Sequence, residues 1–454
     1  MAYYILKSYK LKCKPHELLR IFSERSRCFF LDSSLNANAL GRYSFLGFEP
    51  FYVLSASGKE PFQELRETLA AYKLSLAKCD IPFLGGAVGY LAYDLGLVLE
   101  KKTGGLSKQG LNIPDYLFGF YNTVVIIDNL KSILHIFASG FPEKRSQAAK
   151  ALCEENFKKT RALLTECGSN RSAVVKRRGN TLSPEIKSNF KKGEYLAAVL
   201  KAKEYIKKGD IYQVNLSQRL ETKTDLSAVQ IYERLRHMSP ADFGCYFDGR
   251  EFQILSSSPE RFLKVEGDLV TTRPMKGTRP RCADKKEDRK LKNALLESSK
   301  DKAELMMIVD LLRNDLGRVC DYGSIKVETL RQLETYKTVF QTTATVTGRL
   351  HKTKDSIDLL RACFPGGSIT GCPKIRSMEI IDELEPVRRS VYTGALGYVS
   401  FSGNMDFNIL IRTILKKEDA LYFGAGGGIV ADSVPEEEYK ETLVKAQAMI
   451  QALK

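Results

Sequence analysis

The chain has few of the residues from which zinc sites and disulfide frameworks are built. It contains 4 histidines in 454 residues, and its 10 cysteines are scattered singly without a Cys-x-x-Cys pair. Structural zinc sites need closely spaced cysteines and histidines, and disulfide-rich domains carry cysteines at regular spacings. The sequence therefore argues against a zinc centre and against a disulfide framework, and it predicts reduced thiols.

Long apolar runs are also missing. No stretch approaches the roughly 18 apolar residues of a membrane span, and polar residues interrupt every apolar stretch of the N-terminal segment "MAYYILKSYKLKCKPHELLR". This segment lacks the pattern of a cleavable signal. We therefore expect a cytoplasmic protein that does not interact with membranes.

The net charge is +16, which favours anionic partners. The basic residues are spread along the chain and form no Lys/Arg block with interleaved aromatic residues, as a nucleic-acid surface would. We therefore predict a solvated basic surface and no nucleic-acid partner.

Turn formers and charged residues gather at 166–189, which we interpret as a linker between an N-terminal portion, 1–165, and a second portion, 185–454. The stretch 121–140 has two apolar runs joined by "DNLKS" and predicts a β-hairpin. Elsewhere strands follow one another rather than alternating with single helices. This pattern predicts an α+β chain with large antiparallel sheets.

The stretch "VTTRPMKGTRPR" (270–281) places a lysine beside a glycine among three arginines. Like charges and burial both push a lysine toward its neutral, nucleophilic form. Lys276 is therefore a candidate reactive amine. A cluster of anion-binding side chains explains the same residues equally well.

The last helix, after Pro435, carries carboxylates beside its predicted core stripe. Glu438 and Glu441 lie on an adjoining stripe with Lys445. The predicted core stripe consists of Tyr439, Leu443, Ala446, Ile450 and Leu453.

A second helix, "KDKAELMMIVDLLRNDLGRV", repeats this arrangement, with Asp301 and Glu304 on one edge. Its predicted core residues are Leu305, Ile308, Leu312 and Leu316. If the two edges meet, their carboxylates need a hard cation, for which magnesium is the best candidate. From spacing alone, a solvated face with Glu438 and Glu441 beside Lys445 is the simpler interpretation.

Two glycine-rich stretches offer backbone N–H groups to an anion. In "CFPGGSITGCPKIRSMEIIDEL" the last glycine is followed by Cys372 and Pro373 rather than by Lys and Ser or Thr, so this is not a P-loop. The loop runs into a helix, which suits a carboxylate as well as a phosphate. "FGAGGGIVADS" (423–433) allows a ligand to approach the backbone, or forms a tight turn.

Together these stretches resemble the chorismate-utilising enzymes. The similar segments are "GDIYQVNLSQR", "SSSPERF", "RPMKGTRPR", "DKAELMMIVDLLRNDLGRV", "FPGGSITGCPKIRSMEII", "YTGALGYVS", "IRT" and "GAGGGIVADSVPEEEYKETLVKA", in the family's order from Gly209 to Ala446. N-terminal segments such as "GRYSFLG" and "PFLGGAVGYLAYD" are similar too. The resemblance covers nearly the whole chain.

The resemblance implies two large antiparallel β-sheets packed as a sandwich with helices outside, the portions 1–165 and 185–454 being intertwined in one globular unit. It implies one Mg²⁺-dependent site for chorismate, and it outweighs the solvated-face interpretation. The implied metal-binding residues are Glu304 and Glu441, supported by Asp301 and Glu438. The implied substrate-binding residues are Arg412, Tyr392, Lys445, Gly426, Ser368 and Gly277.

One position separates activities within this family. Members that make anthranilate or isochorismate usually carry alanine where Lys276 stands, whereas members that make 4-amino-4-deoxychorismate carry a lysine that attacks C2 of the ring. The resemblance thus implies amination of chorismate at C4 for 4-aminobenzoate and folate synthesis. Lys276 as a purely electrostatic anchor, and anthranilate synthesis as the activity, remain the alternatives. A scaffold without activity would not need Glu304, Glu441 and Arg412.

Two further catalytic candidates accompany Lys276 in the resemblance, namely Gln213 and Thr278. Members that use water as nucleophile tend to place a lysine at the position of Gln213, so a neutral amide suits ammonia. The chain departs from the family at Gln341, where many members carry histidine. This departure argues against a pyruvate-eliminating activity.

Two partners follow from the resemblance. The segment "FFLDSSL" resembles a tryptophan-binding segment, with Ser33 and Ser34 at the polar contacts, although an ordinary buried strand explains it as well. The sequence lacks the nucleophile elbow, with its cysteine, and the His and Glu of a glutamine amidotransferase. We therefore expect a separate amidotransferase subunit to supply ammonia.

Overall fold

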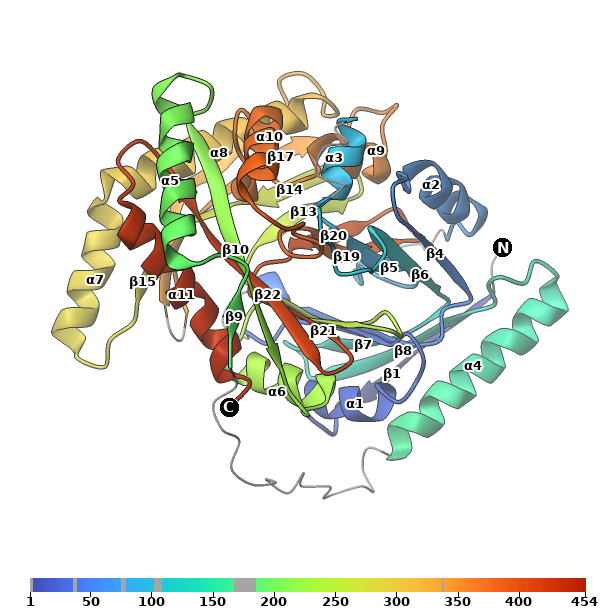
Figure 1. Cartoon of the computed structure of the whole chain (residues 1–454). Coiled ribbons are helices and arrows are strands. Elements are labelled where there is room, and N and C mark those ends of the chain that lie inside the picture. The colour runs from blue at the N-terminus through green and yellow to red at the C-terminus, as the bar shows by residue number, and fades with distance from the viewer. Residues whose placement is uncertain (1–2, 36–38, 75–78, 102–107, 167–184, 337–338) are drawn as a thin grey trace.

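A computed structural model describes residues 3–35, 39–74, 79–101, 108–166, 185–336 and 339–454. Within them the chain forms two antiparallel β-sheets that pack together, with helices on their outer sides (Figure 1). This is the predicted α+β sandwich. Most of the predicted linker, 167–184, lies outside the described residues.

The larger sheet has twelve strands in the described part of the chain. Its order is β1-β8-β7-β3-β2-β11-β12-β21-β22-β10-β18, and β9 also pairs with β10. The bounds are β1 (Tyr4–Lys10), β2 (Phe29–Asp32), β3 (Tyr43–Gly47), β7 (Thr123–Asp128), β8 (Ile133–Ser139), β9 (Lys187–Ser188), β10 (Gln213–Lys223), β11 (Phe243–Asp248), β12 (Gln253–Ser258), β18 (Gly371–Cys372), β21 (Thr413–Lys417) and β22 (Ala420–Ile429).

The second sheet has ten strands, counted over the same described residues. Its order is β15-β17-β14-β13-β20-β19-β5-β6-β4, and β16 also pairs with β17. The bounds are β4 (Tyr52–Ala56), β5 (Gly86–Leu91), β6 (Tyr116–Tyr121), β13 (Arg261–Glu266), β14 (Leu269–Arg273), β15 (Met275–Pro280), β16 (Lys326–Thr335), β17 (Val339–Arg349), β19 (Ala395–Ser400) and β20 (Met405–Ile409).

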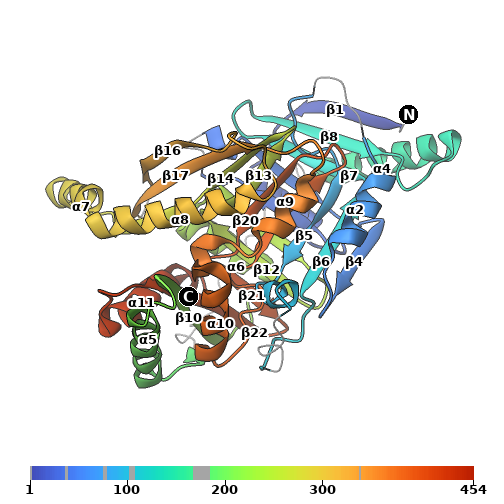
Figure 2. The same cartoon turned by 90° about the horizontal axis from the view of Figure 1, so that it is seen from above.

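Helices cover the outer sides of both sheets. Their bounds are α1 (Pro15–Phe22), α2 (Phe62–Ala71), α3 (Leu95–Leu99), α4 (Ser146–Glu166), α5 (Lys192–Lys207), α6 (Ala228–Met238), α7 (Lys285–Glu297), α8 (Ser299–Gly317), α9 (Ser356–Cys363), α10 (Lys374–Leu384) and α11 (Pro435–Gln451), with 3₁₀ turns η1 (Ala39–Gly41) and η3 (Gly367–Ile369). Helix α8 runs along β15, β16 and β17, while α11 packs on β22 beside α5 (Figure 2). Among the described helices, none is both long and apolar enough to cross a bilayer.

The two portions of the chain share both sheets. In the larger sheet β2 pairs with β11, and in the second sheet β5 pairs with β19. One large apolar cluster fills the space between the sheets, and a smaller one lies between the larger sheet and helices α1, α4, α6 and α11. Neither portion therefore has a sheet of its own within the described residues.

The predicted hairpin is confirmed as β7 paired with β8. The predicted core stripe of α8 is confirmed too, because each of its four residues is at most 3% exposed. In α11 the prediction is correct only in part: Ala446 and Leu453 are buried as predicted, and Tyr439 and Ile450 are partly buried. Leu443 is 41% exposed, whereas Glu438, Thr442, Ala446 and Met449 are buried. Periodicity placed apolar residues inward, but the buried face of α11 includes a carboxylate.

Close backbone packing in the second sheet generates a stability prediction. A Cβ at Gly89, in the middle of β5, would lie 2.0 Å from the carbonyl oxygen of Leu117, and this backbone cannot move aside without disturbing the pairing with β6. We expect Gly89→Ala to lower the free energy of unfolding by about 3 kcal/mol or more, measured by denaturant or thermal unfolding. Gly193→Ala is the matched control, since nothing lies within 4 Å of its Cβ position. Equal stability of the two variants would contradict the close packing.

Candidate active site

Gly277 is the residue that shapes β15 around Lys276. Lys276 pairs with Thr342, whereas Thr278 pairs with the preceding residue of β17, so Gly277 is an extra residue in a β-bulge. Its φ of +75° lies in the region that favours glycine, and a Cβ there would lie 3.0 Å from Cγ of Asp301. The bulge therefore brings β15 close to the first turn of α8.

Lys276 and Gln213 meet over the backbone of β22. A Cβ at Gly428 would lie 2.0 Å from Nε2 of Gln213 and 3.4 Å from Nζ of Lys276. The missing side chain of Gly428 therefore leaves the space that both functional groups use. Gln213 is 1% exposed, and its Oε1 accepts no hydrogen bond from the described residues. This free acceptor beside an amine is typical of a ligand site rather than of a finished core.

Burial is the main cause that lowers the pKa of Lys276. Glu304 opposes it, Lys445 adds to it, and Glu260 and Glu441 oppose it more weakly. The amine is thus held closer to its neutral form than a lysine in water. This supports the nucleophilic interpretation of Lys276.

The three arginines around Lys276 do not have the predicted electrostatic effect. Each is paired with a carboxylate, and none is among the causes of the lysine's pKa shift. The pairs are Arg273 with Glu334, Arg279 with Asp301 and Arg281 with Asp288. The sequence suggested a cluster of free positive charges because it does not reveal these partners.

The four predicted metal ligands lie around β22 and the start of α8. A Cβ at Gly427 would lie 3.1 Å from Oε2 of Glu438 and 3.4 Å from Oε1 of Glu441. Glu304 is close enough to Asp301 and Glu441 for both to raise its pKa, after burial, which is the largest cause. The carboxylates of α8 and α11 therefore lie close enough to influence one another electrostatically.

Local sequence signals place these carboxylates. Ser298 caps α8 by accepting a hydrogen bond from the backbone N–H of Asp301, at 3.1 Å, which fixes this aspartate in the first turn. Helix α11 begins at Pro435, and its first turn contains Glu438, where a carboxylate interacts favourably with the helix dipole. The Ser433 hydroxyl also donates to Glu438, at 2.6 Å.

Cations balance the carboxylates in this structure. The ion pairs are Arg279 with Asp301 at 2.9 Å, Lys300 with Glu438 at 3.9 Å, and Lys445 with Glu441 at 2.6 Å. In the part of the chain that the structure describes, no three acidic, histidine or cysteine side chains are arranged as metal ligands. The donor set nevertheless fits Mg²⁺ chemically, because it offers only carboxylate oxygens.

The carboxylates of this cluster also have shifted pKa values. Burial raises the pKa of Glu438, partly offset by the hydrogen bond from Ser433. Burial would likewise raise the pKa of Glu441, but Lys445 outweighs it, so the pKa of Glu441 is lowered. The two neighbouring carboxylates thus have pKa values shifted in opposite directions.

Glu260 is a functional candidate that the sequence analysis did not single out. Burial raises its pKa to about 7, with the Ser368 hydroxyl and Lys276 working in the opposite direction. The carboxylate is 5% exposed and accepts a hydrogen bond from Ser368 at 2.6 Å. A carboxyl that is half protonated near neutrality can donate or accept a proton. The sequence offered one indication of this residue, because in "SSSPERF" a glutamate closely follows a run of serines.

The predicted carboxylate-binding side chains lie just before two strands that belong to different sheets. Arg412 directly precedes β21, and Tyr392 lies shortly before β19, its ring packed where a Cβ at Gly424 would be 2.3 Å away. Burial lowers the pKa of Arg412. No carboxylate of the described residues lies within 4.0 Å of its guanidinium, so this cation is available for an anion.

The other predicted residues have partners within the protein. Nζ of Lys445 donates to the carbonyl of Gly426 at 2.9 Å. Thr278 is exposed and accepts a hydrogen bond from Nε2 of Gln341 at 3.1 Å, while Oε1 of Gln341 lacks a partner among the described residues.

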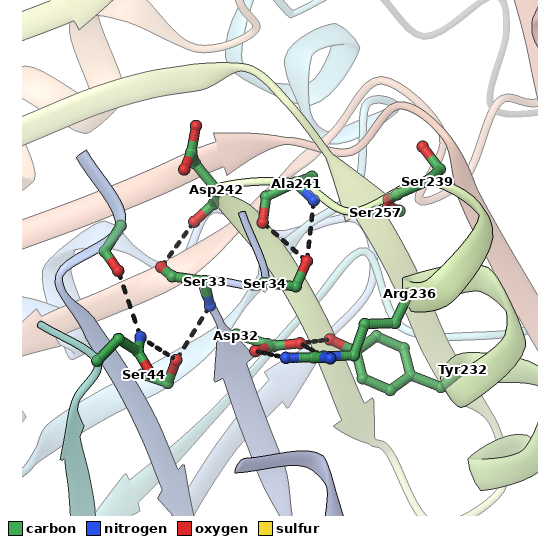
Figure 3. Close-up of polar contacts among 12 residues, drawn as sticks. Asp32, Ser33, Ser34, Ser44, Tyr232, Arg236, Ser239, Ala241, Asp242 and Ser257 are labelled. Carbon is green, nitrogen blue, oxygen red and sulfur yellow. Dashed lines mark hydrogen bonds and ion pairs between the residues drawn. The ribbon is translucent and has the colours of Figure 1, made fainter. Parts of the chain in front are cut away.

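Ser33 and Ser34 directly follow the last residue of β2 (Figure 3). Ser33 lines a cavity of about 240 Å³ between the two sheets, and its hydroxyl donates to the carbonyl of Asp242 at 2.8 Å. Ser34 donates to the carbonyl of Ala241 at 3.1 Å. The Asp242 carboxylate also lines this cavity, is 2% exposed, and accepts no hydrogen bond from the described residues.

Asp242 generates a prediction on stability and pH. Burial, followed by repulsion from Glu334, raises the pKa of Asp242 to about 7. An unfolded aspartate loses its proton near pH 4, so the folded protein binds the extra proton and loses stability as pH rises toward 7. We therefore expect Asp242→Asn to raise the Tm at pH 8 by a few degrees and to change it much less at pH 4. A pH-independent difference would contradict the buried, unpaired carboxylate.

Comparison with known proteins identifies the family. The sequence profile of the family "chorismate binding enzyme" matches residues 26–451. The chain is 36% identical to anthranilate synthase component 1 of Acetivibrio thermocellus over 97% of this chain and 92% of that protein. It is also 36% identical to aminodeoxychorismate synthase component 1 of Escherichia coli, over 93% of this chain and 92% of that protein.

Structural comparison agrees. The crystal structure of anthranilate synthase component I from Streptococcus pneumoniae superposes with a TM-score of 0.79 at 30% identity, covering 92% of this chain and 93% of that one. Relatives with two different activities are thus equally similar in sequence, so overall identity does not distinguish between them. The profile match and the relatives' coverage do establish the wider group, and the chain belongs to the chorismate binding enzyme family.

Proposed function

We propose that this protein is an aminodeoxychorismate synthase, which converts chorismate and ammonia into 4-amino-4-deoxychorismate and water, for 4-aminobenzoate and folate synthesis. The observation that supports this most directly is the amine of Lys276, with a lowered pKa, beside Gln213 and the carboxylate cluster. A lowered pKa makes an amine a better nucleophile at neutral pH, whereas an electrostatic anchor works best when fully charged.

In the first step, the Lys276 amine attacks C2 of the ring. A C–N bond forms, the ring double bonds shift, and the C4–O bond breaks. Glu260, with a pKa of about 7, donates the proton with which the hydroxyl leaves as water. The resulting carboxylate then takes the proton that the new C–N bond releases. Glu260 is then protonated again, and the nitrogen of Lys276 is a neutral secondary amine bonded to C2.

In the second step, ammonia attacks C4 and the C2–N bond breaks. The lysine leaves with a proton from the incoming nitrogen, which regenerates the free enzyme. Gln213 cannot remove a proton, so its amide does not activate water, and its free Oε1 can accept a hydrogen bond from ammonia. Thr278 and Gln341 lie beyond Lys276 on the paired strands and offer no base either.

The carboxylates of Glu304 and Glu441, supported by Asp301 and Glu438, would hold Mg²⁺. When bound, the ion supplies positive charge and Lewis acidity toward the ring carboxylate and the departing hydroxyl. For the ion to bind, Lys300 and Lys445 must give up their present pairs with Glu438 and Glu441.

The second carboxylate of the substrate is assigned to a separate set of residues. Arg412 would bind the enolpyruvyl carboxylate in a bidentate manner, assisted by the hydroxyl of Tyr392. Lys445 and backbone groups of Gly426, Ser368 and Gly277 would complete the anion site.

We further propose that a glutamine amidotransferase subunit supplies the ammonia. The similar proteins of Acetivibrio thermocellus and Escherichia coli both carry the designation "component 1". A second component fits a chain whose sequence offers no cysteine nucleophile elbow. Free ammonium salts should replace this subunit poorly.

Product analysis tests the activity. The chain is incubated with chorismate, Mg²⁺ and ammonium, and the products are separated by chromatography with mass detection. We expect 4-amino-4-deoxychorismate from the wild type, none when Mg²⁺ is chelated, and at least a 100-fold loss in Lys276→Ala. Lys276→Arg keeps the charge but not the nucleophile, and should be equally inactive. Lys290→Ala, on the exposed side of α7, is the matched control with normal activity.

Two outcomes of this experiment would contradict the proposal. Fluorescent anthranilate as the wild-type product would identify the alternative, anthranilate synthase component I. Substantial activity of Lys276→Arg would leave Lys276 as an electrostatic anchor.

We also propose that the cavity lined by Ser33 and Asp242 takes tryptophan. Its buried carboxylate lacks a partner and suits an ammonium group, while the space between the sheets suits an aromatic ring. Calorimetry should show binding that is tighter at pH 8 than at pH 6, because Asp242 ionises near pH 7.

The matched ligand is indole-3-propionate, which lacks the ammonium and should bind at least 10-fold more weakly. Asp242→Asn should weaken the binding of tryptophan by a similar factor. If tryptophan released or absorbed no heat at either pH value, the proposal that this cavity binds tryptophan would be contradicted.

A further inference from the structure

The segment from Ser239 to Asp242 lies between α6 and β11. Serine hydroxyls from β12 and from the residues after β2 hydrogen-bond to its backbone. Ser34 accepts from the backbone N–H of Ala241 at 2.9 Å and donates to the carbonyl of the same residue at 3.1 Å. Ser33 donates to the carbonyl of Asp242, and Ser257 donates to the carbonyl of Ser239 (Figure 3). This irregular segment therefore has its backbone fixed at three of its four residues.

The first residue of this segment contacts Arg412. Nη1 of Arg412 donates to Oγ of Ser239 at 3.4 Å, and the carbonyl of Arg412 accepts from the backbone N–H of Ser257 at 3.1 Å. Ser239 and Ser257 are 4% and 3% exposed. One pair of buried serines, joined to each other, thus contacts both the main chain and the guanidinium of Arg412.

Arg412 needs such support. Its φ of +50° lies in the left-handed region, which is unfavourable for a residue other than glycine. The side chain has no carboxylate partner among the described residues to fix its rotamer. A long side chain that becomes ordered only on binding loses rotamer entropy at that moment. Orientation before binding reduces this loss.

We propose that Ser239 is a positioning residue for the substrate carboxylate: its hydroxyl orients the Arg412 guanidinium, and Ser33, Ser34 and Ser257 keep that hydroxyl in place. The inference rests on the proposed function in one respect, namely that Arg412 binds a carboxylate of chorismate. It gives Ser33 and Ser34 a role that does not require a ligand in the cavity beside them.

The first test is a split between KM and kcat. Ser239→Ala should raise KM for chorismate about 3- to 10-fold and leave kcat within 2-fold, because the contact orients a binding group and does not touch the reacting atoms. Calorimetric binding of chorismate without ammonia should weaken by the same factor. Ser239→Thr keeps the hydroxyl and should restore KM, whereas Ser239→Cys keeps the volume and should behave like Ser239→Ala.

Ser139→Ala is the matched control, because Ser139 is also buried, while its hydroxyl donates to the backbone carbonyl of Asn122 and not to a group of the proposed site. It should leave KM unchanged. Ser34→Ala should raise KM less than Ser239→Ala does, since it loosens the segment without removing the contact to Arg412.

A double-mutant cycle shows whether the effect passes through Arg412. In an Arg412→Lys background, Ser239→Ala should add nothing to the KM, because the oriented guanidinium is already gone. An equal effect of Ser239→Ala in both backgrounds, or a wild-type KM for Ser239→Ala and Ser239→Cys, would overturn the inference. If Arg412→Lys itself binds chorismate normally, the assignment of Arg412 in the proposed function fails, and the inference fails with it.

Discussion

The amine of Lys276 is the group on which the rest of the site depends, because opposing electrostatic effects act on it at once. Burial lowers its pKa, and Lys445 adds to this, whereas Glu304, Glu260 and Glu441 favour the charged form. A cluster of carboxylates beside a nucleophilic lysine would ordinarily hold it protonated. Burial outweighs these carboxylates, one of which, Glu441, is already paired with Lys445.

The glycines of β22 make this crowding possible. At three of them the space of the missing side chain is taken by a side chain from elsewhere in the chain: the ring of Tyr392 at Gly424, Glu438 and Glu441 at Gly427, and Gln213 with Lys276 at Gly428. Strand β22 therefore acts as a flat wall onto which β10, β15 and α11 direct their side chains. The sequence suggested that a ligand approaches this backbone, whereas the structure shows that much of the space belongs to the protein's own side chains.

The sequence predicted those features that depend on local periodicity. The core stripe of α8, the hairpin of β7 and β8, and the meeting of Glu304 with Glu441 follow from spacing together with the family resemblance. What depends on contacts distant in sequence escaped prediction: the inward position of Glu438, the carboxylate partners of the three arginines, and the raised pKa of Glu260. In each case the deciding neighbour lies on another strand or helix, where no local pattern points to it.

The central claim is that Lys276 bonds to the substrate ring. A crystal structure of the enzyme soaked with chorismate and Mg²⁺ in the absence of ammonia tests this most directly. The account predicts Nζ of Lys276 bonded to C2 or within about 3.5 Å of it, in line for attack. Density that places Nζ against a carboxylate, with every ring carbon beyond about 5 Å, would contradict it.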